Sequence, residues 1–417
     1  MNIFIYALGV ISFILIFYLN PLILIPILAI LLLTSLLFIE SRKFFFWLIT
    51  FLIALRPITI DLFFWNSYIF GFKITHIFSV SLIILSFYLI LKLKIKLSDF
   101  NLWILPVIYF LYHFSMFLIS FQFSDVYKSS EYFLRSCGGI PFFFLIGYLL
   151  EKEEDFHKFL KAILVPLIIL IIFSLVFTFY KIDEFYMITG NQKQFWRLKL
   201  LYHDSTQLVI YLTMAFTILC YLFIKEKKFY YLILIYLSTI PIYATQTRSA
   251  WTSSSLILLF FSLYQRKFHY LFPFLLFIFL NFDSIIQRWE YAGIEFDEES
   301  GFSGRLGIWK LAIAYFLNSD ILSQMFGIIL VPLDTHNQYV YWLVSNGIFG
   351  LILNITIILS LIIRAFILSK NPIIIMAFTW IFVSAFFANF LNMPNVSIFL
   401  WSILGYELKK KENLSIP

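Results

Sequence analysis

The segment QYVYWLVSNGIFGLILNITIILSLIIRAFIL, residues 338–368, decides the fold class of this chain. It runs for 31 residues with a single charged side chain, Arg364. About 20 mostly apolar residues suffice for a helix to cross the roughly 30 Å hydrocarbon core of a bilayer. At 1.5 Å per residue, this segment would be about 46 Å long. We therefore expect a spanning helix that either stands above the membrane at its start or breaks near Asn346-Gly347.

The composition of the whole chain is also that of a membrane protein. Of its 417 residues, 62% are hydrophobic and 13% are charged, and the mean hydropathy is +0.93. A soluble globular domain is closer to half apolar and a quarter charged. We predict an all-α polytopic protein, a single transmembrane domain over 1–417 that is embedded in a lipid bilayer, with about 12–14 transmembrane helices. The predicted spans are 3–18, 21–39, 44–60, 76–91, 100–121, 133–150, 162–180, 206–224, 229–245, 249–264, 270–283, 338–368, 372–390 and 396–408.

The N-terminus and the two cysteines give further expectations. The first twenty residues lack a basic region and a small-residue cleavage site, so we expect a retained span rather than a signal peptide. Cys137 and Cys220 fall in spans near opposite faces of the membrane, so we expect no disulfide.

The basic residues in the connections predict the orientation. With the N-terminus in the cytoplasm, the inner side holds 18 of the 30 basic and 9 of the 23 acidic residues, although the outer connections are much longer. The inner face then carries +9 and the outer face −2, which places both termini inside. We assign the net charge of +7 to orientation and predict no nucleic-acid partner. The inner connections are 40–43, 92–99, 151–161, 225–228, 265–269, 364–371 and the tail after Leu408.

The longest outer connection is 284–337, which we predict to be a large loop within the transmembrane domain. It contains SGRLGIWKLAIAYFLNS, residues 303–319, with the pattern of an amphipathic helix. Such a helix would lie along the outer membrane–water interface. Its predicted apolar face consists of Ile308, Trp309, Ala312, Ile313 and Phe316.

Polar residues at the outer ends of the spans are the candidates for chemistry. No Gly-rich phosphate loop, Walker lysine or paired CxxC is present, so ATP is not expected to act through this chain. Charged groups at membrane depth are costly and indicate function. Arg248, in ATQTRSAW, lies in a tight connection between two spans and is predicted to hold an anionic headgroup, with an interfacial arginine as the alternative. Arg135, followed by two glycines, and Arg197, flanked by aromatic residues, are weaker candidates with the same alternative.

Other outward-facing residues are less specific. Arg305 opens the predicted amphipathic helix, where a polar-face arginine needs no special role. Lys73 and His203 also face outward in this topology. The acidic run FDEES, 296–300, is more typical of a solvated loop than of a metal site.

His336 is the leading candidate for acid–base chemistry. It follows Asp334 and Thr335, which are good helix-capping residues, and it stands at the start of the long span. A helix N-terminus disfavours positive charge and helps to keep an imidazole neutral, so that it can accept a proton near pH 7. A structural histidine is the first alternative. An Asp-x-His metal pair is the second, although two ligands are weak grounds for a metal site.

Together these residues resemble the bacterial O-antigen ligase and polymerase family. TRSAW, residues 247–251, matches one family motif. His336-Asn337, nine residues, Gly347, two residues and Gly350 match the family's histidine pattern, and SGRLGIW, residues 303–309, is similar to its outer loop. The resemblance covers about 190–355 by motif and the whole chain by topology. Arg135 and Arg197 are carried over less securely, because the N-terminal half of the family varies.

The resemblance implies a metal-independent, cofactor-free C-type glycosyltransferase in the bacterial inner membrane, with a periplasmic active site. The donor would be a glycan on undecaprenyl pyrophosphate, and the acceptor a sugar hydroxyl of lipid A-core or of another glycan. His336 and Arg248 would be catalytic. Arg135, Arg197, Arg305 and Asn337 would bind the pyrophosphate or the glycan. Inversion at the anomeric carbon is the expected course.

The sequence is compatible with more than one function. We favour the ligase, which transfers a finished polymer to lipid A-core, because the single large outer loop ends in the full histidine motif. A polymerase of the same family is the alternative. A lipid-linked oligosaccharide flippase is less favoured, because transporters carry their charges near the midplane in repeated halves. A polytopic enzyme outside this family is a further reading.

Overall fold

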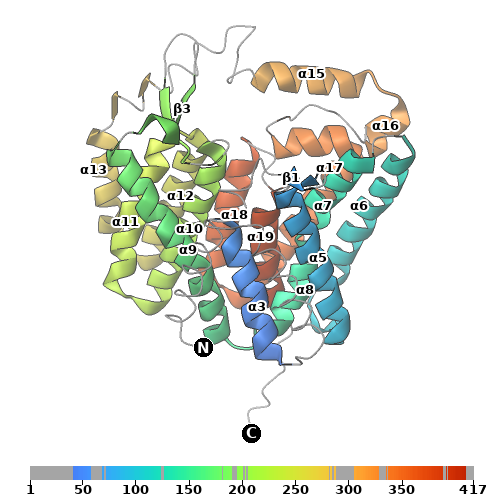
Figure 1. The fold of residues 1–417 in the computed structure, drawn as a ribbon, viewed down its shortest axis with the longest axis horizontal. Coiled ribbons are helices and arrows are strands. Elements are labelled where there is room, and N and C mark those ends of the chain that lie inside the picture. The colour runs from blue at the N-terminus through green and yellow to red at the C-terminus, as the bar shows by residue number, and fades with distance from the viewer. Residues whose placement is uncertain are drawn as a thin grey trace.

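A computed structural model describes residues 41–57, 68–69, 72–123, 126–180, 182–189, 195–200, 202, 205–280, 282–283, 286–287, 305–327, 335, 337–387, 391 and 393–409. Helices form most of this part of the chain and pack side by side as a bundle (Figure 1). Its strands form two antiparallel hairpins. These are β1 (Tyr68–Ile69) with β2 (Phe72–Lys73), and β3 (Tyr186–Thr189) with β4 (Phe195–Leu198).

Apart from spans 3–18 and 21–39, which lie outside the described residues, each predicted span overlaps at least one helix. These helices are α3 (Arg42–Leu55), α5 (Ile74–Lys92), α6 (Ile104–Phe123), α7 (Val126–Cys137), α8 (Ile140–Leu149), α9 (Glu153–Phe179), α10 (Ser205–Glu226), α11 (Phe229–Ala244), α12 (Arg248–Gln265), α13 (Phe272–Leu280), α17 (Gln338–Ser369), α18 (Pro372–Ala385) and α19 (Pro394–Leu408). In the described residues, four segments are long and apolar enough to cross a membrane: Tyr132–Leu149, Glu153–Phe179, Ser205–Glu226 and Gln338–Ser369. The prediction of an all-α membrane protein is confirmed at this level.

Two boundaries differ from the predicted ones. The span predicted at 133–150 is divided between α7 and α8 at Gly138-Gly139. At Gly139 a Cβ atom would lie 2.2 Å from Ser397 Oγ, so the glycine allows α19 to approach closely. The span predicted at 162–180 begins earlier, at Glu153, because three acidic residues in its first turn suit a helix N-terminus.

The predicted inner connections meet at one end of the bundle. Arg42, which begins α3, pairs with Glu151, and Glu153 pairs with Lys225 at the end of α10 at 2.6 Å. Phe100 forms a β-bridge with Lys409, beyond the end of α19. Figure 1 shows the start of α3 at this end, and β3 and α15 (Arg305–Leu317) at the opposite end. The structure thus separates the two predicted sides of the protein from one another.

The long helix α17 is broken at the predicted place. Gly347 has φ 68° and ψ −177°, which is not helical and is accessible almost only to glycine. A Cβ atom there would also lie 2.3 Å from the carbonyl oxygen of Met325. Met325 belongs to α16 (Ile321–Phe326), so α16 fits against the break. α17 therefore consists of a short outer half, residues 338–346, and a long half, residues 348–369.

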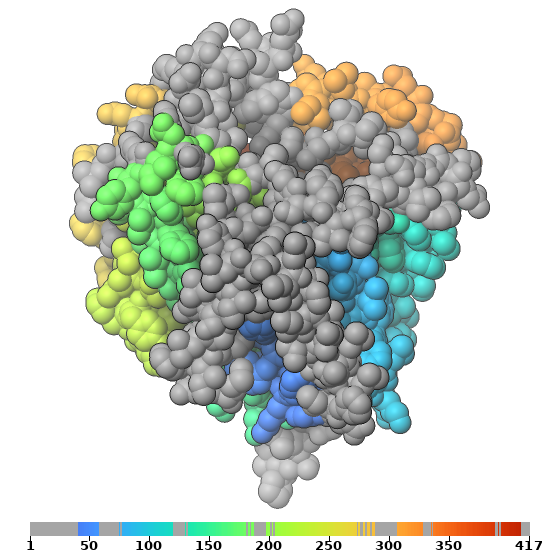
Figure 2. All heavy atoms as spheres, in the orientation of Figure 1, coloured from blue at the N-terminus to red at the C-terminus, as the bar shows by residue number. Residues whose placement is uncertain are grey.

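The helix α15 packs on the outer half of α17, but its surface differs from the prediction. Ala312 and Phe316 are buried against Val344, as expected for the predicted apolar face. Ile313, however, is exposed, and so are Leu311 and Tyr315 on the remaining surface. The helix α15 therefore carries apolar side chains on its exposed surface as well as on its buried face, so it is not simply amphipathic. It packs on α17 and also forms part of the molecular surface (Figure 2).

We predict that Gly347→Ala destabilises the protein by about 1–3 kcal/mol, because alanine strains this backbone conformation and its methyl group meets the backbone of Met325. Gly307→Ala is the matched control, since Gly307 lies in helix α15 and a methyl group added there would meet no atom within 4 Å. Alanine should stabilise that helix by about 0.5–1 kcal/mol. Thermal unfolding in detergent measures both variants. Equal midpoints for the two would contradict the role of Gly347.

Candidate functional site

The turn between α11 and α12 carries a buried arginine. Thr245, Gln246 and Thr247 form this tight connection, and Gln246 adopts a left-handed conformation with φ 53°. Arg248 is the first residue of α12, and only 7% of its surface is exposed. The free N–H groups of a helix start attract anions. Arg248 adds a permanent positive charge at this helix start.

Arg197 reaches the same turn from β4. Its Nε donates to the carbonyl oxygen of Thr245 at 3.1 Å, and its Nη2 donates to Thr247 Oγ1 at 3.0 Å. These two bonds anchor the guanidinium on Thr245 and on Thr247, the residue before Arg248. The structure therefore brings together two of the arginines that the sequence singled out.

Some buried polar atoms of this turn and of the first two turns of α12 lack a partner among the described residues. In the described part of the chain, Gln246 Oε1, Trp251 Nε1 and Ser254 Oγ are buried and make no hydrogen bond. Leaving such groups unpaired costs free energy. We call Arg197, Thr247 and Arg248 the arginine turn.

The outer start of α17 forms a second polar element. Asn337 caps the helix: its Oδ1 accepts hydrogen bonds from the backbone N–H groups of Tyr339 and Val340. Its Nδ2 donates to the carbonyl oxygen of Phe386, after α18. This capping role was predicted for neighbouring residues, and Asn337 itself fulfils it. Its side chain thereby joins the start of α17 to the end of α18 and fixes the backbone next to His336.

Two contacts hold the approach to Asn337. Thr335 is buried, and its hydroxyl donates to the carbonyl oxygen of Asn337 at 2.9 Å. The indole N–H of Trp309, on α15, donates to the carbonyl oxygen of Thr335 at 2.7 Å. The residues on both sides of His336 are therefore fixed by α15 and α18. We call Thr335 and Asn337 the α17 lip.

Helix packing places the arginine turn and the α17 lip at the same end of the bundle. α12 packs against α18. α12 begins at Arg248, and α18 ends beside Phe386, which holds Asn337. Because the two helices run in opposite directions, the start of one and the end of the other lie at the outer end, away from the paired inner connections. Two polar elements from separate helices therefore lie at the same end of the bundle.

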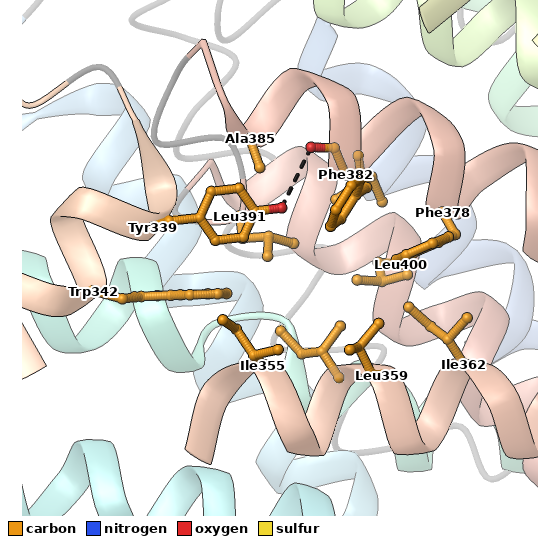
Figure 3. Close-up of a pocket in the computed structure, with 12 residues that line it drawn as sticks. Tyr339, Trp342, Ile355, Leu359, Ile362, Phe378, Phe382, Ala385, Leu391 and Leu400 are labelled. Atoms are coloured by element: carbon orange, nitrogen blue, oxygen red, sulfur yellow. Dashed lines mark hydrogen bonds between the residues drawn. The ribbon is translucent and has the colours of Figure 1, made fainter. Parts of the chain in front are cut away.

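An apolar pocket of about 50 Å³ lies in the angle of the broken α17. Tyr339 and Trp342 line it from the outer half of α17, and Ile355 and Leu359 line it from the long half (Figure 3). Phe382 of α18 completes one wall. The pocket begins two residues after Asn337, so an apolar group held there would lie below the α17 lip.

The other residues predicted for the site lie either elsewhere in the fold or outside the described residues. Arg135 lies on α7 and its side chain is exposed. Figure 1 shows α7 and α12 on opposite sides of α18 and α19. Arg305 begins α15, but its side chain, like that of Lys73, lies outside the described part. His336, His203 and the run 296–300 also lie outside it.

The described residues include both cysteines and were compared with the requirements of a metal site. Cys137 and Cys220 are both buried and free, as predicted. Across the described ranges, no group of three or more His, Cys, Asp or Glu residues could hold a metal ion. Asp334 and His336, the predicted alternative ligands, lie outside those ranges.

Sequence reasoning missed two buried polar residues. Arg56, at the end of α3, is 5% exposed and donates to Ser79 Oγ at 3.0 Å. The following residue, Pro57, accepts a hydrogen bond from the hydroxyl of Tyr202. An arginine followed by proline at the end of an apolar run was a signal that could have been used. His113, in the middle of α6, is fully buried and gave no motif.

No family model matches the chain. No curated protein matches it at a significant level either.

We predict that the arginine turn binds diphosphate. Inorganic pyrophosphate at a hundredfold excess over its dissociation constant would stabilise the folded protein by about 2.7 kcal/mol. The thermal unfolding midpoint of the wild-type protein should therefore rise. Arg248→Gln and Arg197→Gln should lose most of this rise, because each removes a charged donor.

The control for this measurement is Arg364→Gln, which removes an exposed arginine from the inner part of α17. Sodium chloride of equal ionic strength corrects for screening. A rise that persists unchanged in Arg248→Gln would contradict the assignment.

Proposed function

We propose that the chain is a C-type membrane glycosyltransferase of the O-antigen ligase kind. It transfers a glycan en bloc from undecaprenyl pyrophosphate to a sugar hydroxyl of lipid A-core at the periplasmic face. The observation that carries the proposal is the arginine turn, in which Arg197 is anchored on Thr245 and Thr247, next to the buried Arg248. It also rests on the resemblance of the TRSAW and histidine motifs to the family.

The arginine turn supplies what the leaving group needs. As the bond between the anomeric carbon and the pyrophosphate oxygen breaks, negative charge grows on the departing diphosphate. Guanidinium groups and helix N–H groups already aimed at that position stabilise the charge without reorganisation. Arginine suits this role because its planar fork binds two phosphate oxygens at once and its charge is permanent.

The α17 lip supplies the acceptor side of the reaction. His336 removes the proton from the acceptor hydroxyl as that oxygen attacks the anomeric carbon, and the configuration inverts. Thr335 and Asn337 hold the backbone on either side of this histidine. The pair of residues thereby sets the geometry on which general-base catalysis depends.

The pocket in the angle of α17 is suited to an apolar chain. Its described lining is apolar apart from the ends of Tyr339 and Trp342. A polyprenyl or acyl chain held there would bring its polar head toward the outer end of the bundle. The diphosphate of a lipid-linked donor could then reach the arginine turn.

A polymerase of the same family would use the same chemistry on a different acceptor, so the acceptor has to be measured. We expect a strain lacking this protein to make bare lipid A-core while long lipid-linked polymer accumulates. A core that carries one repeat unit would instead identify a polymerase. A lipopolysaccharide gel distinguishes the two.

An unchanged ladder in the deletion strain would remove both enzyme assignments. It would favour the transporter reading, because α17 is discontinuous and transporters share that feature.

The site itself is tested by substitution. Arg248→Lys should lower transfer by about tenfold to a thousandfold, since lysine keeps the charge but loses the planar fork. His336→Ala should abolish transfer while the protein still reaches the membrane. Transfer by purified protein is measured with and without a chelator. Full activity of His336→Ala would eliminate the base assignment, and loss of activity in chelator would favour Asp334 and His336 as metal ligands.

A further inference from the structure

A buried chain of hydrogen bonds connects both halves of the broken helix α17. His113 Nδ1 lies 2.9 Å from the hydroxyl of Tyr132, and His113 Nε2 lies 3.2 Å from Asn354 Oδ1. The Tyr132 hydroxyl also contacts Asn346 Oδ1. Asn346 ends the outer half of α17, and Asn354 lies two turns into the long half. The chain therefore runs from one half through α7 and α6 to the other half.

The surroundings of this chain hold it in a fixed place. His113, Asn346 and Asn354 are fully buried. The ring of Tyr109 lies against the His113 imidazole, with centroids 4.5 Å apart. Tyr112 donates to the carbonyl oxygen of Asn346 at 2.8 Å, which satisfies an acceptor at the break.

A count of protons shows that every contact in this series of hydrogen bonds can have a donor in two different ways. Its three contacts need three protons, of which the Tyr132 hydroxyl supplies one and a neutral imidazole supplies one. The Nδ2 groups of Asn346 and Asn354 are both buried without a partner in the described residues. A side-chain amide and its flipped form fill the same space. Turning either amide therefore supplies the third proton. With Asn346 turned, its Nδ2 donates to Tyr132, Tyr132 donates to His113, and His113 donates to Asn354. With Asn354 turned, each of the three hydrogen bonds has the opposite direction.

We infer that Asn346, Tyr132, His113 and Asn354 form a positioning hub that fixes the angle between the two halves of α17. Hydrogen bonds in a low-dielectric interior are strong, so a buried side-chain network of this kind holds the elements that it joins in one arrangement. The outer half of α17 carries Asn337 and packs on α15, so its direction decides where the α17 lip lies. His113 and Tyr132 then act on the reaction through His336, a role that rests on the proposed function.

The first test measures the angle directly and needs no activity. Spin labels at Lys310→Cys, on α15, and Ile363→Cys, on the long half of α17, report the distance across the break, and both positions are exposed. The two native cysteines, both buried, are replaced by alanine. Tyr132→Phe and Asn354→Leu each cut the hub at nearly constant volume. Both should shift or broaden the distance distribution of the full-length protein in detergent.

The matched control is Tyr236→Phe. The Tyr236 hydroxyl also makes a bond between elements, to the carbonyl oxygen of Tyr270 at 3.0 Å, but it lies on α11. This variant loses a similar bond and should keep the parent distribution. The hub is overturned if Tyr132→Phe and Asn354→Leu also keep that distribution.

The second test links the hub to transfer. Tyr132→Phe should lower kcat by about tenfold to a hundredfold, because displacing a catalytic group by about 1 Å has effects of this size. The KM for the lipid-linked donor should stay within about twofold of the parent value, since the arginine turn is not touched. A kcat equal to that of Tyr236→Phe would overturn the link between hub and site. Absence of transfer in the parent protein would overturn the proposed function, while the distance measurement still decides on the hub.

Discussion

The break of α17 at Gly347 is the constraint on which the rest of the outer half depends. A helix in a bilayer satisfies its own backbone, and a break is tolerated only where protein groups take over the freed hydrogen bonds. Here Tyr112 donates to the carbonyl oxygen of Asn346, and α16 lies against Gly347 so closely that no side chain would fit. The break therefore exists because α6 and α16 are both in place. In turn it directs the outer half of α17 under α15.

The broken helix also explains why one face of α17 is apolar and another is polar at nearly the same depth. The two halves enclose the pocket between Trp342 and Ile355, while Asn346 and Asn354 face α6 and α7. A straight helix of 32 residues would extend beyond the membrane and would enclose no such angle. The break therefore converts excess length into a pocket and a lip.

The sequence predicted the helices well because the bilayer imposes a simple rule on apolar length. It also offered a break near Asn346-Gly347 as one of two explanations for an overlong span, and the structure shows this break. It placed Arg197 and Arg248 among the candidates, but only the structure shows that Arg197 is bound to Thr245 and Thr247. Such contacts depend on how β4 packs against the α11–α12 turn, and the spacing of residues along the chain does not predict them.

His113 shows where sequence reasoning ends. A histidine in an apolar run has no motif around it, and its partners are 19 and 241 residues away. Its burial is nevertheless informative, because a buried polar group costs free energy unless it is hydrogen-bonded. The free energy that these hydrogen bonds contribute depends on α6, α7 and α17 keeping one arrangement, so a displacement of any one of these helices breaks the chain. The arrangement of α6, α7 and α17 and the hydrogen bonds of His113 therefore depend on each other.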